Sequence, residues 1–278
     1  MNLKEIYQPI EMKLDQVEKE MASVVCADIS KHPVNEILNN FFKTPGKRLR
    51  PALAMLSAGM INDSLPDETN EQLIKLAVVL ELIHSTSLIH DDIIDNDTLR
   101  RGQKTLNGEY GRKIAVLAGD VLYARTFSLL TTQMPTSFTE EIIKLTESMC
   151  AAEIEQAKPG SVTQELYLSI IRGKTAEFMS ASCRLGGVLA GATPSQVEAL
   201  SVYGLNLGIT YQLIDDIMDG DVDSSLGIDL SFVERYALRA LNALDAFENS
   251  PYKESLIKFV SYILNFLLKL ADVQTKNA

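Results

Sequence analysis

The sequence predicts an all-α protein built as a single-domain helical bundle. Apolar residues recur at the spacing of an α-helix along nearly the whole chain, whereas the alternation typical of strands is almost missing. Glycine and proline, which interrupt helices, number only 15 and 9 among 278 residues. Hydrophobic residues make up 46% of the chain and no low-complexity linker divides it. We therefore expect one domain, residues 1–278, around one large core.

The first half of the chain is expected to form four helices. Ile6, Ile10 and Leu14 begin a helical repeat that continues to about Cys26. Arg50-Pro51 is expected to open the third helix, because proline suits a first helical turn. The predicted helices, separated by Thr44-Pro45-Gly46 and by a loop at 63–67, cover residues 3–26, 33–42, 50 onwards and 71–95.

The second half is expected to begin with a loop and to continue with six helices. Residues 102–111 contain three glycines and are the predicted loop. Pro135, Pro159-Gly160 and a polar stretch at 220–227 supply the later breaks. The predicted helices cover residues 113–130, 139–156, 164–189, 194–218, 232–247 and 252–270. Helices 71–95 and 194–218 are apolar around much of their circumference, which predicts a central position in the bundle.

Composition excludes several classes of function. The formal net charge of −11 and the pI of about 4.8 disfavour binding to nucleic acids and to anionic lipid surfaces. Cys26, Cys150 and Cys183 are widely spaced without a C-x-x-C pattern, so neither a zinc site nor a disulfide framework is indicated. We therefore expect a reduced, cytoplasmic protein. No apolar run approaches the roughly 18 residues of a membrane span and no apolar signal region follows Met1, so we expect no transmembrane segment.

Two copies of the pattern D-D-x-x-D carry most of the functional information. The first ends helix 71–95 and the second ends helix 194–218; their aspartates are Asp91, Asp92, Asp95, Asp215, Asp216 and Asp219. Positions i, i+1 and i+4 of a helix turn three carboxylates toward one side. Carboxylates are the usual ligands of Mg²⁺, which commonly bridges to substrate phosphates. Two such clusters facing each other predict chemistry on a diphosphate held through metal ions.

Cationic residues accompany these acidic clusters. Arg100-Arg101-Gly102 follows the first cluster, and Gly46-Lys47-Arg48-Leu49-Arg50-Pro51 lies upstream of it. Gly173-Lys174-Thr175 lies one helix before the second cluster, which Tyr211-Gln212 precedes directly. Arginine suits forked contacts to phosphate oxygens. A second diphosphate bound directly by Arg and Lys side chains is therefore expected.

These motifs, with the run from Leu82 through His84 and His90 to Asp95, resemble those of the trans-isoprenyl diphosphate synthases (polyprenyl synthetases) in the same order. The resemblance covers about Leu3 to Asp219. It implies the isoprenoid synthase type of bundle with a central active-site cavity, Mg²⁺ as cofactor and a homodimer. The implied reaction condenses an allylic diphosphate with isopentenyl diphosphate into a longer all-trans polyprenyl diphosphate. Loss of pyrophosphate from the allylic substrate is the step that metal ions and cationic side chains would assist.

The resemblance also implies roles for individual residues. The six aspartates would hold the metal ions, the second cluster partly through water. Arg100, Lys174 and Gln212 would contact the allylic diphosphate, and Thr175, with a helix break at Lys174, would place oxygen dipoles near the carbocation. Isopentenyl diphosphate would bind to Lys47, Arg50, His84 and Arg101.

Product length is expected to depend on the cavity below the first cluster. Thr86 and Ser87 lie on this path, where aromatic residues close the tunnel in family members that make short products. Both are small here, which predicts a product beyond C15. Tyr123 or Phe127, on helix 113–130, is expected to form a deeper floor.

Other interpretations remain for parts of the pattern. His84 and His90 lie on a mostly apolar helix, where a single histidine is more often a hydrogen-bonded core residue, and His84 is favoured for the site only by its place seven residues before Asp91. Arg48 is interpreted as surface charge, and an exposed helical face explains Glu153, Glu155 and Gln156 as well as a cavity wall does. Two other functions also stay open. A non-catalytic subunit of a heteromeric synthase typically has degraded aspartate motifs, and a terpene cyclase usually lacks the second motif.

The sequence after Asp219 departs from the family pattern. Members usually continue with a Gly-Lys loop, an Asp-Leu segment, another Lys and several helices. Here a polar stretch leads directly into what resembles the last two helices, and Lys253 is the next lysine after Lys174. Either lid and C-terminal helices near 221–231 are lacking, or the printed sequence omits residues, so that Ser225–Leu226 or Leu230–Ser231 are false neighbours. The second explanation is favoured, because a loss of core helices would expose apolar surface.

Overall fold

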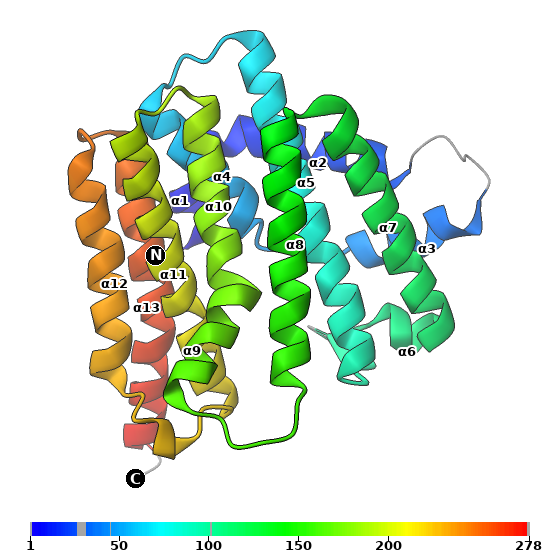
Figure 1. The fold of residues 1–278 in the computed structure, drawn as a ribbon, viewed down its shortest axis with the longest axis vertical. Helices are drawn as coiled ribbons and strands as arrows, with labels where there is room; N and C mark the ends of the chain where they lie inside the picture. Colours follow the sequence, from blue (N-terminus) through cyan, green and yellow to red (C-terminus); the bar gives the residue numbers. More distant parts are fainter. Residues whose placement is uncertain (1, 27–31, 45, 101, 277–278) are drawn as a thin grey trace.

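The computed structural model describes residues 2–26, 32–44, 46–100 and 102–276. Long helices packed side by side make up nearly all of this part of the chain (Figure 1), which confirms the predicted all-α class. A short antiparallel hairpin joins β1 (Leu99–Arg100) to β2 (Gln103–Lys104). The helices are α1 Leu3–Tyr7, α2 Glu11–Val25, α3 Pro33–Phe42, α4 Leu49–Ile61, α5 Asp67–Ile94, α6 Leu106–Tyr110, α7 Arg112–Gln133, α8 Thr136–Gln156, α9 Gln164–Ile171, α10 Glu177–Leu189, α11 Pro194–Asp219, α12 Leu230–Ala243 and α13 Pro251–Lys276.

Four short helical segments complete the chain. Three are 3₁₀-helical and one is a π-helical turn between α9 and α10; they are η1 Gln8–Ile10, η2 Arg172–Ala176, η3 Ser224–Leu226 and η4 Leu244–Ala246. The π-helical turn η2 interrupts the helix that the sequence predicts over residues 164–189. The predicted loop over 102–111 is wrong in part, because it contains β2 and α6. Thr105 begins α6 by accepting a hydrogen bond from the Gly108 amide at 2.9 Å.

Helices α5 and α11, which end in the two acidic motifs, form the centre of the bundle as predicted. Helix α11 packs against α10 and α12, and α5 packs against α4 and α7. Two glycines allow close backbone approach at this centre. A Cβ atom on Gly186 of α10 would lie 2.1 Å from the Ala54 carbonyl oxygen, and one on Gly208 of α11 would lie 2.5 Å from Cα of Ala176. Larger residues at either position would push the helices apart.

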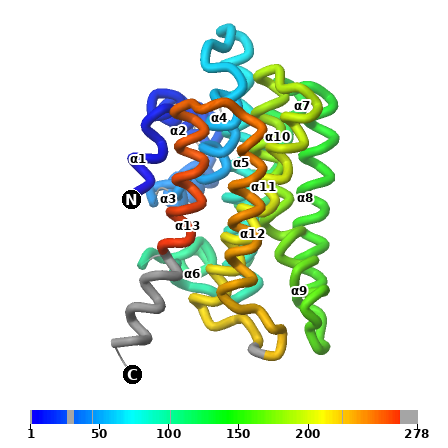
Figure 2. The backbone as a smooth tube through the Cα atoms, turned by 90° about the vertical axis from the view of Figure 1, so that its left-hand side faces the viewer, coloured from blue at the N-terminus to red at the C-terminus, as the bar shows by residue number. Residues whose placement is uncertain are grey.

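The C-terminal helix α13 closes one side of the core. The buried Tyr203 side chain of α11 donates a hydrogen bond to the Leu256 carbonyl oxygen of α13 at 2.8 Å. Figure 2 shows α12 and α13 (orange and red) beside α11, with α1 next to α13. The N-terminal and C-terminal helices therefore pack on the same side of the bundle.

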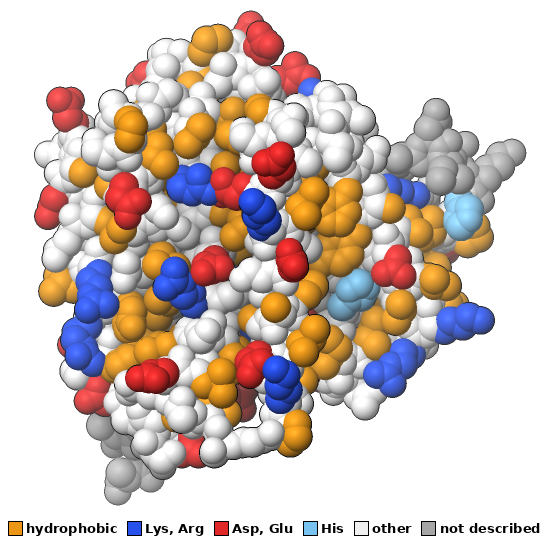
Figure 3. All heavy atoms as spheres, in the orientation of Figure 1, with side chains coloured by type: hydrophobic (Ala, Val, Ile, Leu, Met, Phe, Trp, Pro, Cys, Tyr) orange, Lys and Arg blue, Asp and Glu red, His pale blue; other side chains and the backbone are white. Residues whose placement is uncertain are grey.

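Helices α5 and α7 are long and apolar enough to cross a membrane by length and composition alone. We expected no stretch of the chain to reach the length of a membrane span. That prediction counted uninterrupted apolar runs, whereas these two helices qualify as apolar windows that include scattered polar residues. The most apolar window of α5 is 67% buried within the fold, as expected of a core helix, whereas that of α7 is only 33% buried. Ile114, Val116 and Leu117 of α7 are exposed. Exposed hydrophobic side chains also gather over α7 and α8 in the space-filling view (Figure 3).

Candidate active site

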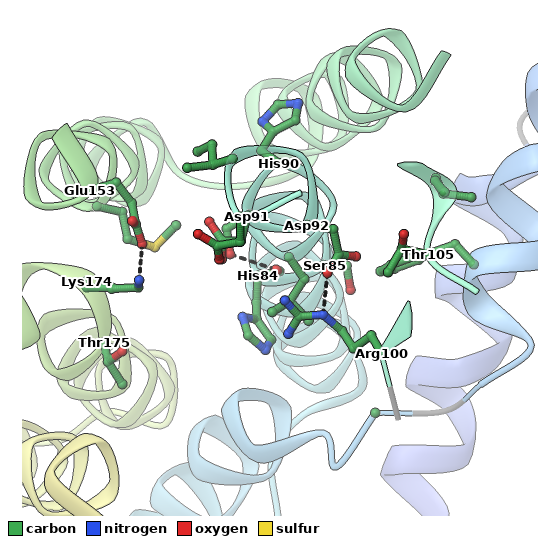
Figure 4. A pocket seen from close by; sticks show the side chains of 18 of the residues that line it. His84, Ser85, His90, Asp91, Asp92, Arg100, Thr105, Glu153, Lys174 and Thr175 are labelled. Atoms are coloured by element: carbon green, nitrogen blue, oxygen red, sulfur yellow. Dashed lines mark hydrogen bonds and ion pairs between the residues drawn. The ribbon is translucent and has the colours of Figure 1, made fainter. Parts of the chain in front are cut away.

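A cavity of about 1240 Å³ lies where the C-terminal ends of α5 and α11 meet. Both acidic motifs and the cationic residues that accompany them line it. Figure 4 shows Asp91 and Asp92 of the first motif with Arg100 and Lys174 nearby. The residues predicted for the site that line this cavity are Lys47, Arg50, His84, Ser87, Asp91, Asp92, Asp95, Arg100, Tyr123, Lys174, Thr175, Gln212, Asp215, Asp216 and Asp219. Thr86 and Phe127 do not line it, and Arg101 lies outside the described residues.

In the first acidic motif, the middle aspartate is held by an arginine. Asp92 is 2% exposed, and its Oδ1 accepts a hydrogen bond from Nε of Arg100 at 2.6 Å. The hairpin β1–β2 carries Arg100 back toward the end of α5. Asp91 and Asp95, one helical turn apart, face the cavity. Burial, and then the negative charge of Glu153, raise the pKa of Asp91 to about 6.

In the second motif, the middle aspartate is held by neutral groups. Asp216 accepts hydrogen bonds from the Tyr167 hydroxyl at 2.5 Å and from Nε2 of Gln212 at 2.8 Å. The Thr175 hydroxyl in turn donates to Oε1 of Gln212 at 2.7 Å. Burial raises the pKa of Asp216, although both hydrogen bonds oppose this shift. The chain of contacts links the π-helical turn η2 to the end of α11.

The helix break predicted at Lys174 is confirmed, and it is the π-helical turn η2. Nζ of Lys174 lies 2.5 Å from Oε1 of Glu153 and donates to Oε1 of Gln156 at 3.2 Å (Figure 4). Both partners lie on α8. The Thr175 hydroxyl, whose oxygen was predicted to lie near a carbocation, donates a hydrogen bond to Gln212 of α11.

The start of α4 and the residues just before it form the cationic side of the cavity. Nζ of Lys47 lies 5.9 Å from the centroid of the Tyr211 ring, and the Arg50 guanidinium lies 5.3 Å from the centroid of the Phe178 ring. The interpretation of Arg48 as surface charge is wrong. Arg48 is 9% exposed and lines the same cavity, because two carboxylates draw it inward.

The expected product tunnel is only partly as predicted. The Thr86 side chain is fully buried, and its hydroxyl donates to the Leu82 carbonyl oxygen of its own helix, so it lies behind the cavity wall. Ser87 and Tyr123 line the cavity, and Tyr123 stacks on Phe127 with ring centroids 5.6 Å apart. Tyr123 therefore separates Phe127 from the cavity.

Several residues of the site were left open or were not predicted to belong to it. Glu153 and Gln156, for which a cavity wall and an exposed face were both considered, lie three positions apart on the face of α8 that lines the cavity. Tyr167 stands seven positions before Lys174, which is two helical turns, and that spacing could have placed both on one face. Glu81 is the one charged residue between Leu76 and Ile83. A single charged residue within an apolar helical sequence predicts a buried ion pair.

The segment after Asp219 is a short link in the structure. Gly220 and Gly227 adopt left-handed backbone conformations at φ of 80° and 63°. Between them, the Leu226 carbonyl oxygen accepts a hydrogen bond from Nε2 of Gln164 at 2.7 Å, which attaches the link to α9. Both explanations for its unusual length stay predictions.

The donor set fits a divalent metal ion that is shared with a substrate. All six aspartates line the cavity, but Asp92 and Asp216 are already hydrogen-bonded to neighbours. Within the described residues, no group of three or more His, Cys, Asp or Glu side chains stands ready to hold a metal ion. Mg²⁺ typically takes one or two carboxylates and completes its shell with water and phosphate oxygens. Burial raises the pKa of Asp91, so positive charge added beside this carboxylate would be favourable.

The polyprenyl synthetase family pattern matches residues 31–226, which is well over half of the chain. The chain is 33% identical over 216 residues to a geranylgeranyl diphosphate synthase of Sulfolobus acidocaldarius, covering 74% of this chain and 63% of that protein. It is 30% identical over 226 residues to the octaprenyl diphosphate synthase of Escherichia coli, covering 80% and 68%. The chain thus spans less than two thirds of the first relative's length.

Solved structures agree on the fold. A decaprenyl diphosphate synthase from Rhodobacter capsulatus superposes with a TM-score of 0.83 at 24% identity, covering 95% of this chain and 99% of that one. A polyprenyl synthase from Caulobacter crescentus, complexed with calcium and isoprenyl diphosphate, superposes with a TM-score of 0.80 at 24% identity, covering 94% and 97%. The chain has the all-α fold of these synthases, and it belongs to the polyprenyl synthetase family.

Proposed function

We propose that this protein is a prenyltransferase that condenses an allylic diphosphate with isopentenyl diphosphate to give a longer all-trans polyprenyl diphosphate. One observation carries the proposal: two acidic motifs and two separate cationic groups line one cavity of about 1240 Å³. Arg100 and Lys174 lie beside the acidic motifs, whereas Lys47 lies just before α4 and Arg50 lies in its first turn. Two diphosphates can therefore be held in one chamber, one at each cationic group.

Mg²⁺ bound to the cavity-facing aspartates would supply positive charge for the departing pyrophosphate. The similar structure from Caulobacter crescentus, complexed with calcium and isoprenyl diphosphate, supports a divalent ion of this kind. Arg100 and Lys174 would hold the allylic diphosphate in line with the isopentenyl double bond, and fixed cations of this kind stabilise developing negative charge. The ion pair of Lys174 with Glu153 keeps the ammonium group at the cavity wall before substrate binds.

A product beyond C15 remains the proposal for chain length. The named relatives include geranylgeranyl, octaprenyl and heptaprenyl synthases, which supports a longer product. Ser87 and Tyr123 line the cavity below Asp91, so a Ser87→Phe substitution should shorten the product. The buried Thr86→Phe should change product length less. Product chain lengths measured by chromatography test both, and an unchanged length in Ser87→Phe contradicts the tunnel.

A homodimer through α7 is the proposed assembly. Ile114, Val116 and Leu117 are exposed on a helix whose apolar window is only 33% buried, and contiguous apolar surface of this kind marks interaction sites. A second candidate is a heteromeric synthase, which one relative favours because it is component 2 of a heptaprenyl diphosphate synthase. Light scattering of the purified chain distinguishes them: a stable dimer supports the first, and a monomer supports the second.

The decisive experiment incubates the protein with Mg²⁺, labelled isopentenyl diphosphate and allylic primers of increasing length. Metal-dependent elongation of at least one primer is expected. A cyclic hydrocarbon formed without isopentenyl diphosphate would indicate a terpene cyclase instead. No elongation of any primer would overturn the proposal, and activity that appears only after a second protein is added would indicate a subunit of a heteromeric synthase.

A further inference from the structure

Glu81 is a buried carboxylate of the cavity that has no role in the proposed reaction so far. It lies on α5 and is 2% exposed. Its Oε1 accepts a hydrogen bond from Nη1 of Arg48 at 2.8 Å, whereas its Oε2 is buried without a hydrogen-bond partner in the described part of the chain. A half-satisfied buried carboxylate is costly, and such groups are retained where they serve a second purpose.

Arg48, the partner of Glu81, adopts an unusual backbone conformation. Its φ of 54° is in the left-handed region, which is unfavourable for a residue with a side chain because Cβ approaches the following carbonyl oxygen. Glu18 of α2 binds the same guanidinium through two contacts, Nε–Oε1 at 2.5 Å and Nη2–Oε2 at 3.0 Å. Arg48 is therefore clamped between one carboxylate near the surface and one in the core, and the clamp maintains the left-handed turn.

The turn at Arg48 places Lys47, directly before it, and Arg50, two positions after it. The Tyr7 hydroxyl donates to the Lys47 carbonyl oxygen at 2.7 Å, which fixes the segment from the other side. A Cβ atom on Gly46 would lie 3.1 Å from Nη1 of Arg48 and 3.3 Å from Oε1 of Glu81. The segment thus packs tightly onto the ion pair and has little freedom to shift.

Arg50 also depends on Glu81, through charge rather than contact. Nε of Arg50 is buried without a hydrogen-bond partner in the described residues. Burial lowers the pKa of Arg50, and the negative charge of Glu81 is the largest influence that opposes this shift. Glu81 therefore stabilises a guanidinium that lines the cavity and has donors available for an anion.

We propose that Glu81 is a positioning residue for the isopentenyl diphosphate subsite: it holds Arg48 in the left-handed turn, so that Lys47 and Arg50 on either side of this turn face one diphosphate together. This inference rests on the proposed function. It also explains why a carboxylate stands beside an anion site, where its charge alone would weaken binding.

The test compares Glu81→Gln with Glu18→Gln. Both remove one carboxylate from Arg48, but the Glu18 side chain is 46% exposed. Glu81→Gln should raise KM for isopentenyl diphosphate about tenfold and leave KM for the allylic primer unchanged, since the loss is confined to one subsite. Glu18→Gln should change either KM by less than about threefold, as exposed ion pairs contribute little.

Direct binding separates this inference from the proposed function. Calorimetry with isopentenyl diphosphate and no primer should show binding to the unmodified protein, and weaker binding to Glu81→Gln. If the unmodified protein binds nothing, the proposed function fails; if it binds and Glu81→Gln binds equally or more tightly, the inference alone fails. Should Glu81→Gln unfold, Arg48→Lys must show the same selective rise in KM, because lysine keeps the charge but loses the forked contacts.

Discussion

The two acidic motifs share one sequence pattern but differ in how their middle aspartate is held. Asp92 is paired with a cation, Arg100, at 2.6 Å. Asp216 accepts hydrogen bonds from two neutral donors, Tyr167 and Gln212, at 2.5 and 2.8 Å. The middle aspartate of the first motif is therefore paired with a charged donor, whereas that of the second motif is hydrogen-bonded by uncharged ones.

This difference teaches that the second motif depends more strongly on an added cation. A diphosphate can approach Arg100 at the first motif directly, whereas the donors that hold Asp216 at the second motif carry no charge. In both motifs the middle aspartate is hydrogen-bonded to a neighbour, and the outer two aspartates, one turn apart, also line the cavity. The outer aspartates are thus the expected metal ligands, and the middle ones are anchors.

The largest expected effect is at an outer aspartate. Asp91→Asn should lower kcat about a thousandfold, because a ligand for the charge that stabilises departing pyrophosphate is lost. Initial rates with labelled isopentenyl diphosphate measure it. Asp97→Asn is the matched control, since Asp97 is exposed and outside the cavity lining. A loss of less than tenfold in Asp91→Asn would contradict the division into ligands and anchors.

The next effect concerns the charged anchor. Arg100→Gln leaves the buried Asp92 carboxylate without its cation, and we expect kcat/KM for the allylic primer to fall about a hundredfold. Raising the metal concentration should not restore activity, because the missing charge is part of the protein. An effect confined to KM for isopentenyl diphosphate would contradict the assignment of Arg100 to the allylic diphosphate.

The neutral anchor should be less sensitive. Tyr167→Phe removes one of two donors to Asp216, and we expect about a tenfold loss of activity at low Mg²⁺. Because the second motif relies on added cations, this loss should diminish as Mg²⁺ is raised, unlike that of Arg100→Gln. Mn²⁺ binding followed by spin resonance should weaken in parallel, and Tyr236→Phe on α12 serves as control. Equal metal responses in the two variants would remove the contrast between the motifs.

The fold and the position of the motifs could be predicted because both follow from local signals. Helix α11, for example, begins with a capping box between Thr193 and Gln196, and its apolar text continues to the second motif. The aspartates of each acidic motif could be identified for the same reason, because each motif is a contiguous stretch of the chain. The cationic segment at 46–51 could likewise be identified, although Arg48 was assigned to the surface.

Partners across helices could not be predicted in the same way. Lys174 and Glu153 come from different helices, and only packing of η2 against α8 brings their charges to 2.5 Å. Thr86 was expected in the tunnel because its spacing from Asp91 is right, but the rotation of α5 turns it into the core. Sequence spacing gives the face of a helix, and the neighbouring helices decide what that face meets.

The smallest expected effect tests the charge at the first motif without any substrate. The pKa of Asp91 is raised from 3.8 to about 6 in the folded protein, so the folded state binds the proton more tightly than the unfolded state. Folding stability should therefore fall as pH rises from about 4 to 6, and the full penalty is present at pH 7. Asp91→Asn removes this penalty and should stabilise the metal-free protein by about 1–2 kcal/mol at pH 7, after allowance for solvent screening. At pH 4 the gain should vanish, and Mg²⁺ with pyrophosphate should abolish it at pH 7, because bound cations then stabilise the ionised carboxylate. Thermal unfolding from pH 4 to 8 measures the effect against Asp97→Asn, and a gain independent of pH would show that Asp91 carries no such charge penalty.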